Sequence, residues 1–349
     1  DAGAILHADS DFNVFIGDTV ADATMTATAD NNTGVGYAAL GALTEGDRNT
    51  AVGKDSLLAL TTGTYNVAIG YDAGTALVGG THNVIIGDSA GIATTTVDKT
   101  VLIGQGAGAG AMDADADGTV AIGWNAGNAI TSGRYNTAVG YEAGAALTVG
   151  DRNTAVGYQA FKALTTSGNT GGTAVGYGAG ALTLGGYNTI IGRGALSAAT
   201  AAQSNIAIGD SAMLNATEET DAAVSGCIAI GGSAMGDATD LTTGANHTIA
   251  IGSGACNVLQ SGGNSIAIGQ SALTRVTTGN LNVCIGLEAG QGVTTGEGNT
   301  VVGNGAMNHA SNTDGDDNVC IGYAAGDSLN EGNNNVVLGA NADTSAATA

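Results

Sequence analysis

The hydrophobic and polar positions of this chain repeat with a short period that ends each time in glycine. A pattern of the type Asn-Thr-Ala-Val-Gly, or a close relative of it, occurs nineteen times. Eleven of the eighteen intervals between closing glycines are 17 residues long. Because a 17-residue unit cannot bury a core alone, the period predicts a solenoid whose coils stack on one another. With the closing glycine taken as position 0 of each repeat, these residues are Gly17, Gly36, Gly53, Gly70, Gly87, Gly104, Gly123, Gly140, Gly157, Gly176, Gly192, Gly209, Gly231, Gly252, Gly269, Gly286, Gly303, Gly322 and Gly339.

Alternation before the glycine predicts one short strand in each repeat. Position −1 is Val or Ile in eighteen repeats and position −3 is β-branched in all nineteen, as in Val52 and Thr50. Position −2 is small in most repeats, as in Ala51. Side chains alternate between the faces of a strand, so positions −1 and −3 share a face. We expect their Val, Ile and Thr columns to fill a dry interior, with position −2 on the other face.

Three further positions predict how a coil is closed. Position −4 is Asn in thirteen repeats, and stacked asparagines can form a hydrogen-bonded ladder. The glycine at position 0 supplies a backbone angle that other residues resist. Position +3 is Ala in seventeen repeats, which indicates close approach of another backbone. The remainder, as in residues 60–64, is expected to form a second short strand or a turn.

The predicted fold class is therefore all-β, a parallel β-solenoid of about nineteen coils of about 17 residues. Residues 13–342 form the repeat shaft, residues 1–12 an N-terminal cap or connection, and residues 343–349 a C-terminal connection. The longest intervals, of 22 and 21 residues, end at Gly231 and Gly252. Their extra acidic residues are expected to protrude into solvent: Glu218, Glu219, Asp221, Asp237 and Asp240.

The charge of the chain argues against two classes of partner. The 31 acidic and 8 basic residues give a net charge of −23. Nucleic acids and anionic lipid surfaces would be repelled, so we expect neither to be bound. No apolar stretch is long enough to span a bilayer, so no membrane insertion is expected. Because no basic-then-apolar export signal begins the sequence, any such signal or anchor is expected outside this segment.

Two stretches carry a resemblance to known surface proteins. Residues 264–269, Asn-Ser-Ile-Ala-Ile-Gly, resemble the head repeat of trimeric autotransporter adhesins, which forms a left-handed parallel β-roll. Residues 153–160 look more like repeats of bacteriophage tail fibres. The resemblance covers residues 13–342 and implies a homotrimer in which the small residues at positions −2 and +3 form the contact faces. The longer repeat and the absence of a heptad stalk favour a fibre.

The resemblance also implies a function and a location. A fibre shaft of a viral tail fibre or surface appendage is a structural protein, not an enzyme, that positions a host-recognition tip. Its location is extracellular, on a virion or a cell surface. A host receptor or glycan would be bound through a tip outside this segment.

One acidic stretch is a candidate calcium site. Asp113, Asp115 and Asp117, followed by Gly118, match the opening of a calcium loop with alternating oxygen ligands. The twelfth position is Trp124 where that loop requires Glu, so a complete EF-hand is excluded. The alternative is a solvated acidic bulge. A similar cluster consists of Asp314, Asp316 and Asp317.

No other motif indicates catalysis or a cofactor. The glycine-rich residues 104–108 lack the βαβ context of a dinucleotide site. The histidines show no shared repeat position and no nearby nucleophile: they are His7, His82, His247 and His309.

Cysteines and tyrosines are interpreted as structural. The cysteines lack metal-type spacing and are expected to be small buried residues: Cys227, Cys256, Cys284 and Cys320. Cys284 and Cys320 lie two coils apart, too far for a disulfide within one chain. Aromatic residues recur at position +1, where Tyr141 and Tyr158 should be neighbours in a ladder or a sugar-binding row: Tyr37, Tyr71, Trp124, Tyr141, Tyr158, Tyr177 and Tyr323.

Three other functions stay open. The first is a bacterial adhesin head that binds glycan or matrix directly. The second is an ice-binding solenoid, which requires an exposed flat threonine array, whereas position −3 mixes Thr with Val and Ile. A hydrolytic spike is a third, although no carboxylate pair recurs in a suitable context.

Overall fold

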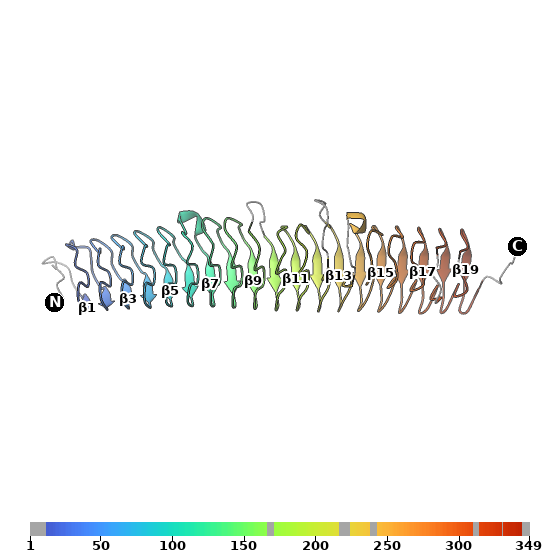
Figure 1. Ribbon diagram of the computed structural model, residues 1–349, viewed down its shortest axis with the longest axis horizontal. Helices are drawn as coiled ribbons and strands as arrows, with labels where there is room; N and C mark the ends of the chain where they lie inside the picture. The colour runs from blue at the N-terminus through green and yellow to red at the C-terminus, as the bar shows by residue number, and fades with distance from the viewer. Residues whose placement is uncertain are drawn as a thin grey trace. The chain divides into compact units, whose positions relative to one another are not determined.

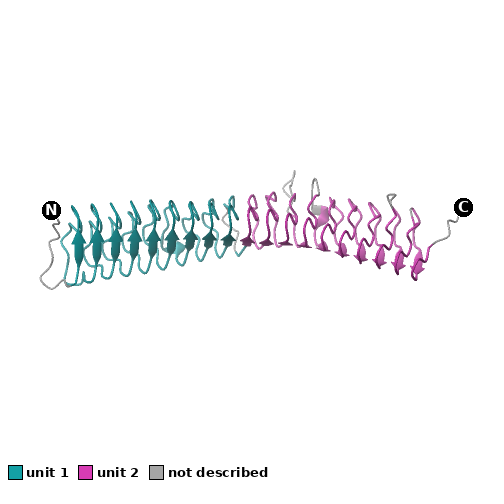
Figure 2. Ribbon diagram, turned by 90° about the horizontal axis from the view of Figure 1, so that it is seen from below, with its two compact units in different colours: residues 1–172 teal, residues 173–349 magenta. Residues whose placement is uncertain are grey.

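The fold is a parallel β-solenoid with one three-residue strand per coil (Figure 1). The computed structural model describes residues 12–165, 171–215, 224–237, 243–309, 314–329 and 331–343. The chain divides into two compact units, residues 1–172 and 173–349, which are coloured separately in Figure 2. Of the acidic residues predicted to protrude, Glu218, Glu219, Asp221 and Asp240 lie outside the described residues, as do most of the two predicted terminal connections.

Unit 1 contains nine strands and one 3₁₀ turn among its described residues: β1 (Val14–Ile16), β2 (Thr33–Val35), β3 (Thr50–Val52), β4 (Val67–Ile69), β5 (Val84–Ile86), β6 (Val101–Ile103), η1 (Ala114–Ala116), β7 (Val120–Ile122), β8 (Thr137–Val139) and β9 (Thr154–Val156). Unit 2 contains ten strands and one 3₁₀ turn in its described part: β10 (Thr173–Val175), β11 (Thr189–Ile191), β12 (Ile206–Ile208), β13 (Ile228–Ile230), η2 (Thr243–Ala245), β14 (Ile249–Ile251), β15 (Ile266–Ile268), β16 (Val283–Ile285), β17 (Thr300–Val302), β18 (Val319–Ile321) and β19 (Val336–Leu338). Across these ranges, no helix has the length and apolar character needed to cross a membrane.

Within each unit, consecutive strands pair in parallel with equivalent repeat positions opposite one another. In unit 1, for example, Thr50 pairs with Val67 and Val52 with Ile69. The amide of Gly70 donates to the carbonyl of Val52 over 2.8 Å, so the ladder continues through the closing glycine. Between strands the described backbone forms turns and bends, which confirms the turn alternative for the rest of the coil. The prediction of one strand per repeat is thereby confirmed.

The predicted interior is wrong: position −2 faces inward, and positions −3 and −1 face outward. Ala51 is fully buried, whereas Ile69 at position −1 is 40% exposed. Position +3 is also buried within the single chain, as at Ala73. Most of the large buried side chains come from positions +4 and +7, for example Leu57 and Leu60. A 17-residue coil encloses a narrow space, and these leucines fill much of it. Small residues therefore predominate at position −2, although Ile85 and Ile190 are also fully buried there.

In some coils a larger residue at position −2 is accompanied by glycine at position +4. Where position −2 carries Ile85 or Cys284, position +4 is Gly91 or Gly290. A Cβ atom on Gly290 would lie 2.5 Å from the Cys284 sulfur. This exchange is local, because Ile190 at position −2 and Leu196 at position +4 are both fully buried in one coil.

Left-handed backbone recurs at fixed positions of the coil. Positions +2, +4 and −5 have positive φ even where the residue is not glycine, as at Asp55 (55°), Leu57 (50°) and Tyr65 (59°). The repeated turn, not the residue type, imposes this conformation, since a non-glycine residue in this region costs about 1 kcal/mol.

Candidate functional site

The outward side of the strands is the candidate functional surface. We define the strand face as the residues at positions −3 and −1 of strands β1–β9 in unit 1 and β10–β19 in unit 2. Every one of these residues is Thr, Val, Ile or Leu, and none is charged. Figure 1 shows the strands of each unit side by side along one edge of the coils.

Water reaches this apolar face in a single chain. Ile69, Ile191 and Ile321 are 40%, 40% and 41% exposed. The parallel register places equivalent residues next to each other from coil to coil, so these side chains form continuous columns along each unit. Contiguous apolar patches of this kind mark interaction surfaces in soluble proteins.

Several other outward positions of the coil carry charge and so differ from the strand face. Position +1 includes Lys54 and Asp88, and position −6 includes Asp47, Asp98 and Asp151. In a chain of net charge −23, two adjacent outward columns without any charge are notable. The core of a protein–protein interface is depleted of charged residues in the same way.

The exposure of position −3 corrects one expectation about ice binding. Because this position faces outward, the chain does expose threonines on a parallel sheet, as at Thr50 and Thr137. Threonine occupies seven of the nineteen −3 positions, and position −1 is Val, Ile or Leu throughout. The face is therefore mainly aliphatic and not a threonine array.

The resemblance to trimeric repeats implied contact faces that the structure does not support. Positions −2 and +3 were expected to meet neighbouring chains, but Ala51 and Ala73 have no exposed surface. These alanines pack instead inside the narrow coil. The strand face replaces them as the surface open to a partner.

The aromatic row at position +1 is ordered by stacking. Trp124 stacks on Tyr141 with ring centroids 4.6 Å apart, and Tyr141 on Tyr158 at 5.2 Å, which confirms that the two tyrosines are neighbours. Lys162 and Gln159 donate to Glu142 beside this row, and these hydrogen bonds, led by that of Lys162, lower the pKa of the Glu142 carboxyl. Since the rings cover each other's faces, mainly edges and hydroxyl groups are left for a ligand.

The three carboxylates of the candidate calcium site have separate partners. Asp113 precedes η1 and accepts a hydrogen bond from the Asp115 amide over 2.9 Å. Asp115 forms an ion pair with Arg134 at 2.7 Å, and Asp117 accepts from the Asp98 amide over 2.7 Å. In the part of the chain that the structure describes, no group of three or more His, Cys, Asp or Glu side chains could hold a metal ion. Calcium binding stays a prediction.

The second acidic cluster is likewise tied to neighbouring coils. Asp314 accepts hydrogen bonds from the hydroxyls of Thr295 (2.6 Å) and Thr294 (2.9 Å). These bonds, the first of them most, lower the pKa of the Asp314 carboxyl. Asp316 accepts from the Glu297 amide over 2.9 Å, so both carboxylates serve turn geometry.

Two histidines do share a repeat position, contrary to expectation. His82 and His247 both occupy position −5 with left-handed backbone, at φ of 60° and 59°. The His82 ring stacks on Tyr65 of the preceding coil at 4.8 Å. His309 lies elsewhere in the coil, and His7 lies outside the described residues. Their common position reflects the left-handed turn that recurs in each coil.

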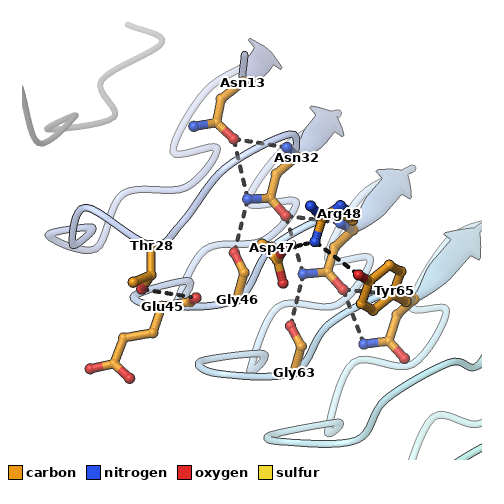
Figure 3. Close-up of polar contacts among 11 residues, drawn as sticks. Asn13, Thr28, Asn32, Glu45, Gly46, Asp47, Arg48, Gly63 and Tyr65 are labelled. Carbon is orange, nitrogen blue, oxygen red and sulfur yellow. Dashed lines mark hydrogen bonds and ion pairs between the residues drawn. The ribbon is translucent and has the colours of Figure 1, made fainter. Parts of the chain in front are cut away.

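The buried polar residues form the predicted asparagine ladder. As Asn32 does with Asn13 in Figure 3, Asn49 donates from its backbone amide to the side-chain oxygen of Asn32 over 2.9 Å and from its side-chain nitrogen to the same oxygen over 3.1 Å. The same nitrogen donates to the carbonyl of Gly63 over 2.8 Å. Such an asparagine therefore links the start of its strand to the preceding coil and also to the turn before the next strand. The ladder satisfies buried polar groups and holds the strands in register.

Residues 104–108 form an ordinary turn of the solenoid. Gly104 closes a repeat, and a Cβ atom on Gly108 would lie 2.6 Å from both Leu102 and Met112. These glycines therefore make room for the core side chains around them.

The buried cysteines give a prediction for alkaline solution. All four are free and buried, as expected. Burial raises the pKa of Cys256 from 9.0 to about 12, and that of Cys284 well above 9.0. Above pH 9 the unfolded chain loses these protons while the folded chain keeps them, so stability should fall as pH rises. Each thiol should lower the free energy of unfolding by about 1.4 kcal/mol per pH unit between its two pKa values.

The measurement is urea unfolding at pH 8 and at pH 10.5. Replacement of Cys256 by Ala should remove part of the pH dependence, and an unchanged dependence would contradict the assignment. A thiol reagent at pH 8 should modify the cysteines only after denaturation.

Comparison with known protein families and with curated proteins finds no match to this chain. The fold itself defines the class of the protein, a β-solenoid repeat protein with an uncharged and partly exposed strand face.

Proposed function

We propose that the chain is the structural shaft of a trimeric fibre, a viral tail fibre or a surface appendage, that holds a recognition tip away from a virion or cell surface. The observation that carries this proposal is the uncharged, partly exposed strand face present in both units. A partner that covers this face over many coils must itself be long and apolar with the same repeat. Other copies of the chain meet that requirement.

Further features support a mechanical role. Every described coil is held to its neighbours by backbone hydrogen bonds, and much of the stack also by buried asparagines. Stability in such an array is a sum of local contacts between neighbouring coils, so it extends to any length. The copy number of three, the left-handed winding and the extracellular location follow from the resemblance to fibre and adhesin repeats.

Light scattering of the purified chain tests this proposal. We expect a mass of three chains of 33.5 kDa each. Resistance to proteases should be lost when the assembly dissociates, because dissociation exposes the strand faces. A mass of one chain at micromolar concentration would contradict the proposal.

Direct binding of glycan is a second candidate function. Trp124, Tyr141 and Tyr158 favour it, since the three are 39%, 42% and 40% exposed in one row. A glycan array probed with this chain alone would detect such binding. Loss of the signal in a Trp124→Ala variant would assign it to the row.

A further inference from the structure

We propose that copies of the chain meet through their strand faces, parallel and at equal height, so that each residue of the face lies against the same residue of the other copies. This inference deepens the proposed function and rests on it for the number of copies. It replaces the contact faces that the resemblance implied, because those residues are buried.

The charge distribution selects this face. A cyclic assembly brings identical surfaces of its copies near one axis, so any charge on the meeting surface would face its own kind. Positions +1 and −6 carry carboxylates such as Asp88 and Asp98, which would repel their equivalents. On the strand face, by contrast, side chains such as Val139 and Ile69 carry no charge.

The size of the face is comparable with that of a known protein–protein contact. A three-residue strand is about 10 Å long and neighbouring strands lie about 4.8 Å apart. The nine strands of unit 1 then present about 430 Å² and the ten of unit 2 about 480 Å². A standard protein–protein interface buries about 800 Å² on each partner, so the two faces of a chain, divided between two neighbours in a trimer, have in total about the size of one such interface.

The register follows from the symmetry of three copies. Three identical chains around one axis are related by rotation alone, which leaves all of them parallel and equivalent residues at equal height. Threonines such as Thr137 and Thr154 would then meet threonines, whose hydroxyls can hydrogen-bond across the axis. Valine and isoleucine layers would meet side chains of their own size.

Paired aspartates on the face provide the test. In full-length chain, Val139→Asp with Val156→Asp places charges at position −1 of β8 and β9. The matched control, Ser132→Asp with Val149→Asp, changes position −8 of the same two coils. We expect the strand pair to reduce the mass measured by light scattering to one chain and the control pair to leave it unchanged. Retention of the assembled mass by the strand pair would overturn the inference.

Mixing charged copies tests the register. Aspartate-pair chains refolded with Val139→Lys, Val156→Lys chains should regain the assembled mass, because each mixed trimer then has two opposite-charge contacts at equal height for one like-charge contact. A partner with lysine at Val52 and Ile69, five coils away, should not rescue assembly. Equal rescue by both lysine partners, or by neither, would overturn the in-register arrangement.

Circular dichroism of each variant separates misfolding from dissociation. These residues face outward, so the β signal of the separated aspartate-pair chains should be retained. If that pair failed to fold alone, the two refolded mixtures would still decide between registers. A one-chain mass for the unmodified protein would contradict the proposed function as well. An assembled mass that the strand-pair substitutions leave unchanged would contradict only this inference.

Discussion

A Gly53→Ala substitution should destabilise the solenoid by roughly 3 kcal/mol or more, since residues other than glycine strongly resist this backbone conformation. Gly53 has φ of 133°, and an added Cβ atom would meet the carbonyl group of Gly70 in the next coil. Relief of that clash requires the coils to separate, which breaks the ladder on both sides of the glycine. Hydrogen exchange should accelerate at the amide of Gly70, which donates to Val52.

The matched control is Gly79→Ala in the same unit. A Cβ atom there would make an ordinary contact of 3.6 Å with the Thr62 hydroxyl, and the backbone of Gly79 is not left-handed. The free energy of unfolding of the Gly79→Ala variant should differ from that of the unsubstituted chain by less than about 1 kcal/mol. Equal effects of the two substitutions in chemical unfolding would contradict the role assigned to the closing glycine.

An Asn66→Ala substitution should have the second largest effect, a loss of roughly 3–5 kcal/mol. The Asn66 side-chain oxygen accepts from the amide and the side-chain nitrogen of Asn83, over 3.1 Å and 2.9 Å. Its own nitrogen donates to the carbonyl of Gly80 over 2.7 Å. Alanine leaves these buried groups without their partner, and an unsatisfied buried donor or acceptor costs more than a hydrogen bond contributes.

Two variants calibrate the Asn66 result. Asn66→Thr should lower the free energy of unfolding by about half as much as Asn66→Ala. Thr100 occupies the equivalent position in another coil and donates to the Asn83 oxygen over 2.7 Å. Asn304→Ala changes an exposed asparagine and should be nearly neutral. Denaturant titration of the three variants gives the order directly, and a neutral Asn66→Ala would show that the ladder contributes nothing to stability.

The sequence predicted the architecture because the constraints that build a solenoid act on every coil. The closing glycine, the strand before it and the asparagine ladder each recur at one spacing, so their signals add. The interior was predicted wrongly because both faces of the strand are apolar, as in Val84, Ile85 and Ile86 of β5. Alternation groups the residues into two faces but does not say which one faces inward.

Side-chain volume does not distinguish the two faces either. Glycine at position +4 accompanies the larger Ile85 at position −2 in one coil, but Ile190 is accompanied by Leu196 in another, and both are fully buried. The volumes at these positions therefore do not compensate regularly enough to identify the interior from the sequence.

The left-handed backbone at position −5 could have been predicted from the sequence. Four repeats carry glycine there, at Gly118, Gly171, Gly226 and Gly298, all with positive φ. Glycine in a column of otherwise varied residues indicates a conformation that favours it. Recognition of that column would also have shown that two histidines share it.

The candidate surface could not be predicted because it depends on which side of the strand faces outward. Once the inward face is known, the lack of charge at the outward positions becomes informative.

The consequences of interruptions in the asparagine ladder also could not be predicted from the sequence. Cys227 and Thr248 replace asparagine at the ends of the two longest repeats, and the Cys227 amide still donates to Asn205 over 2.9 Å. The backbone bond survives although the side chain changes.

An electron cryo-microscopy map of the assembled full-length chain tests the central claim most directly. It should show three parallel copies whose valine and isoleucine columns, including Val139 and Ile69, lie against their equivalents around one axis, with the alanines of position −2 inside each coil. Copies joined through the charged turns, or a single chain whose strand face remains in water, would contradict it.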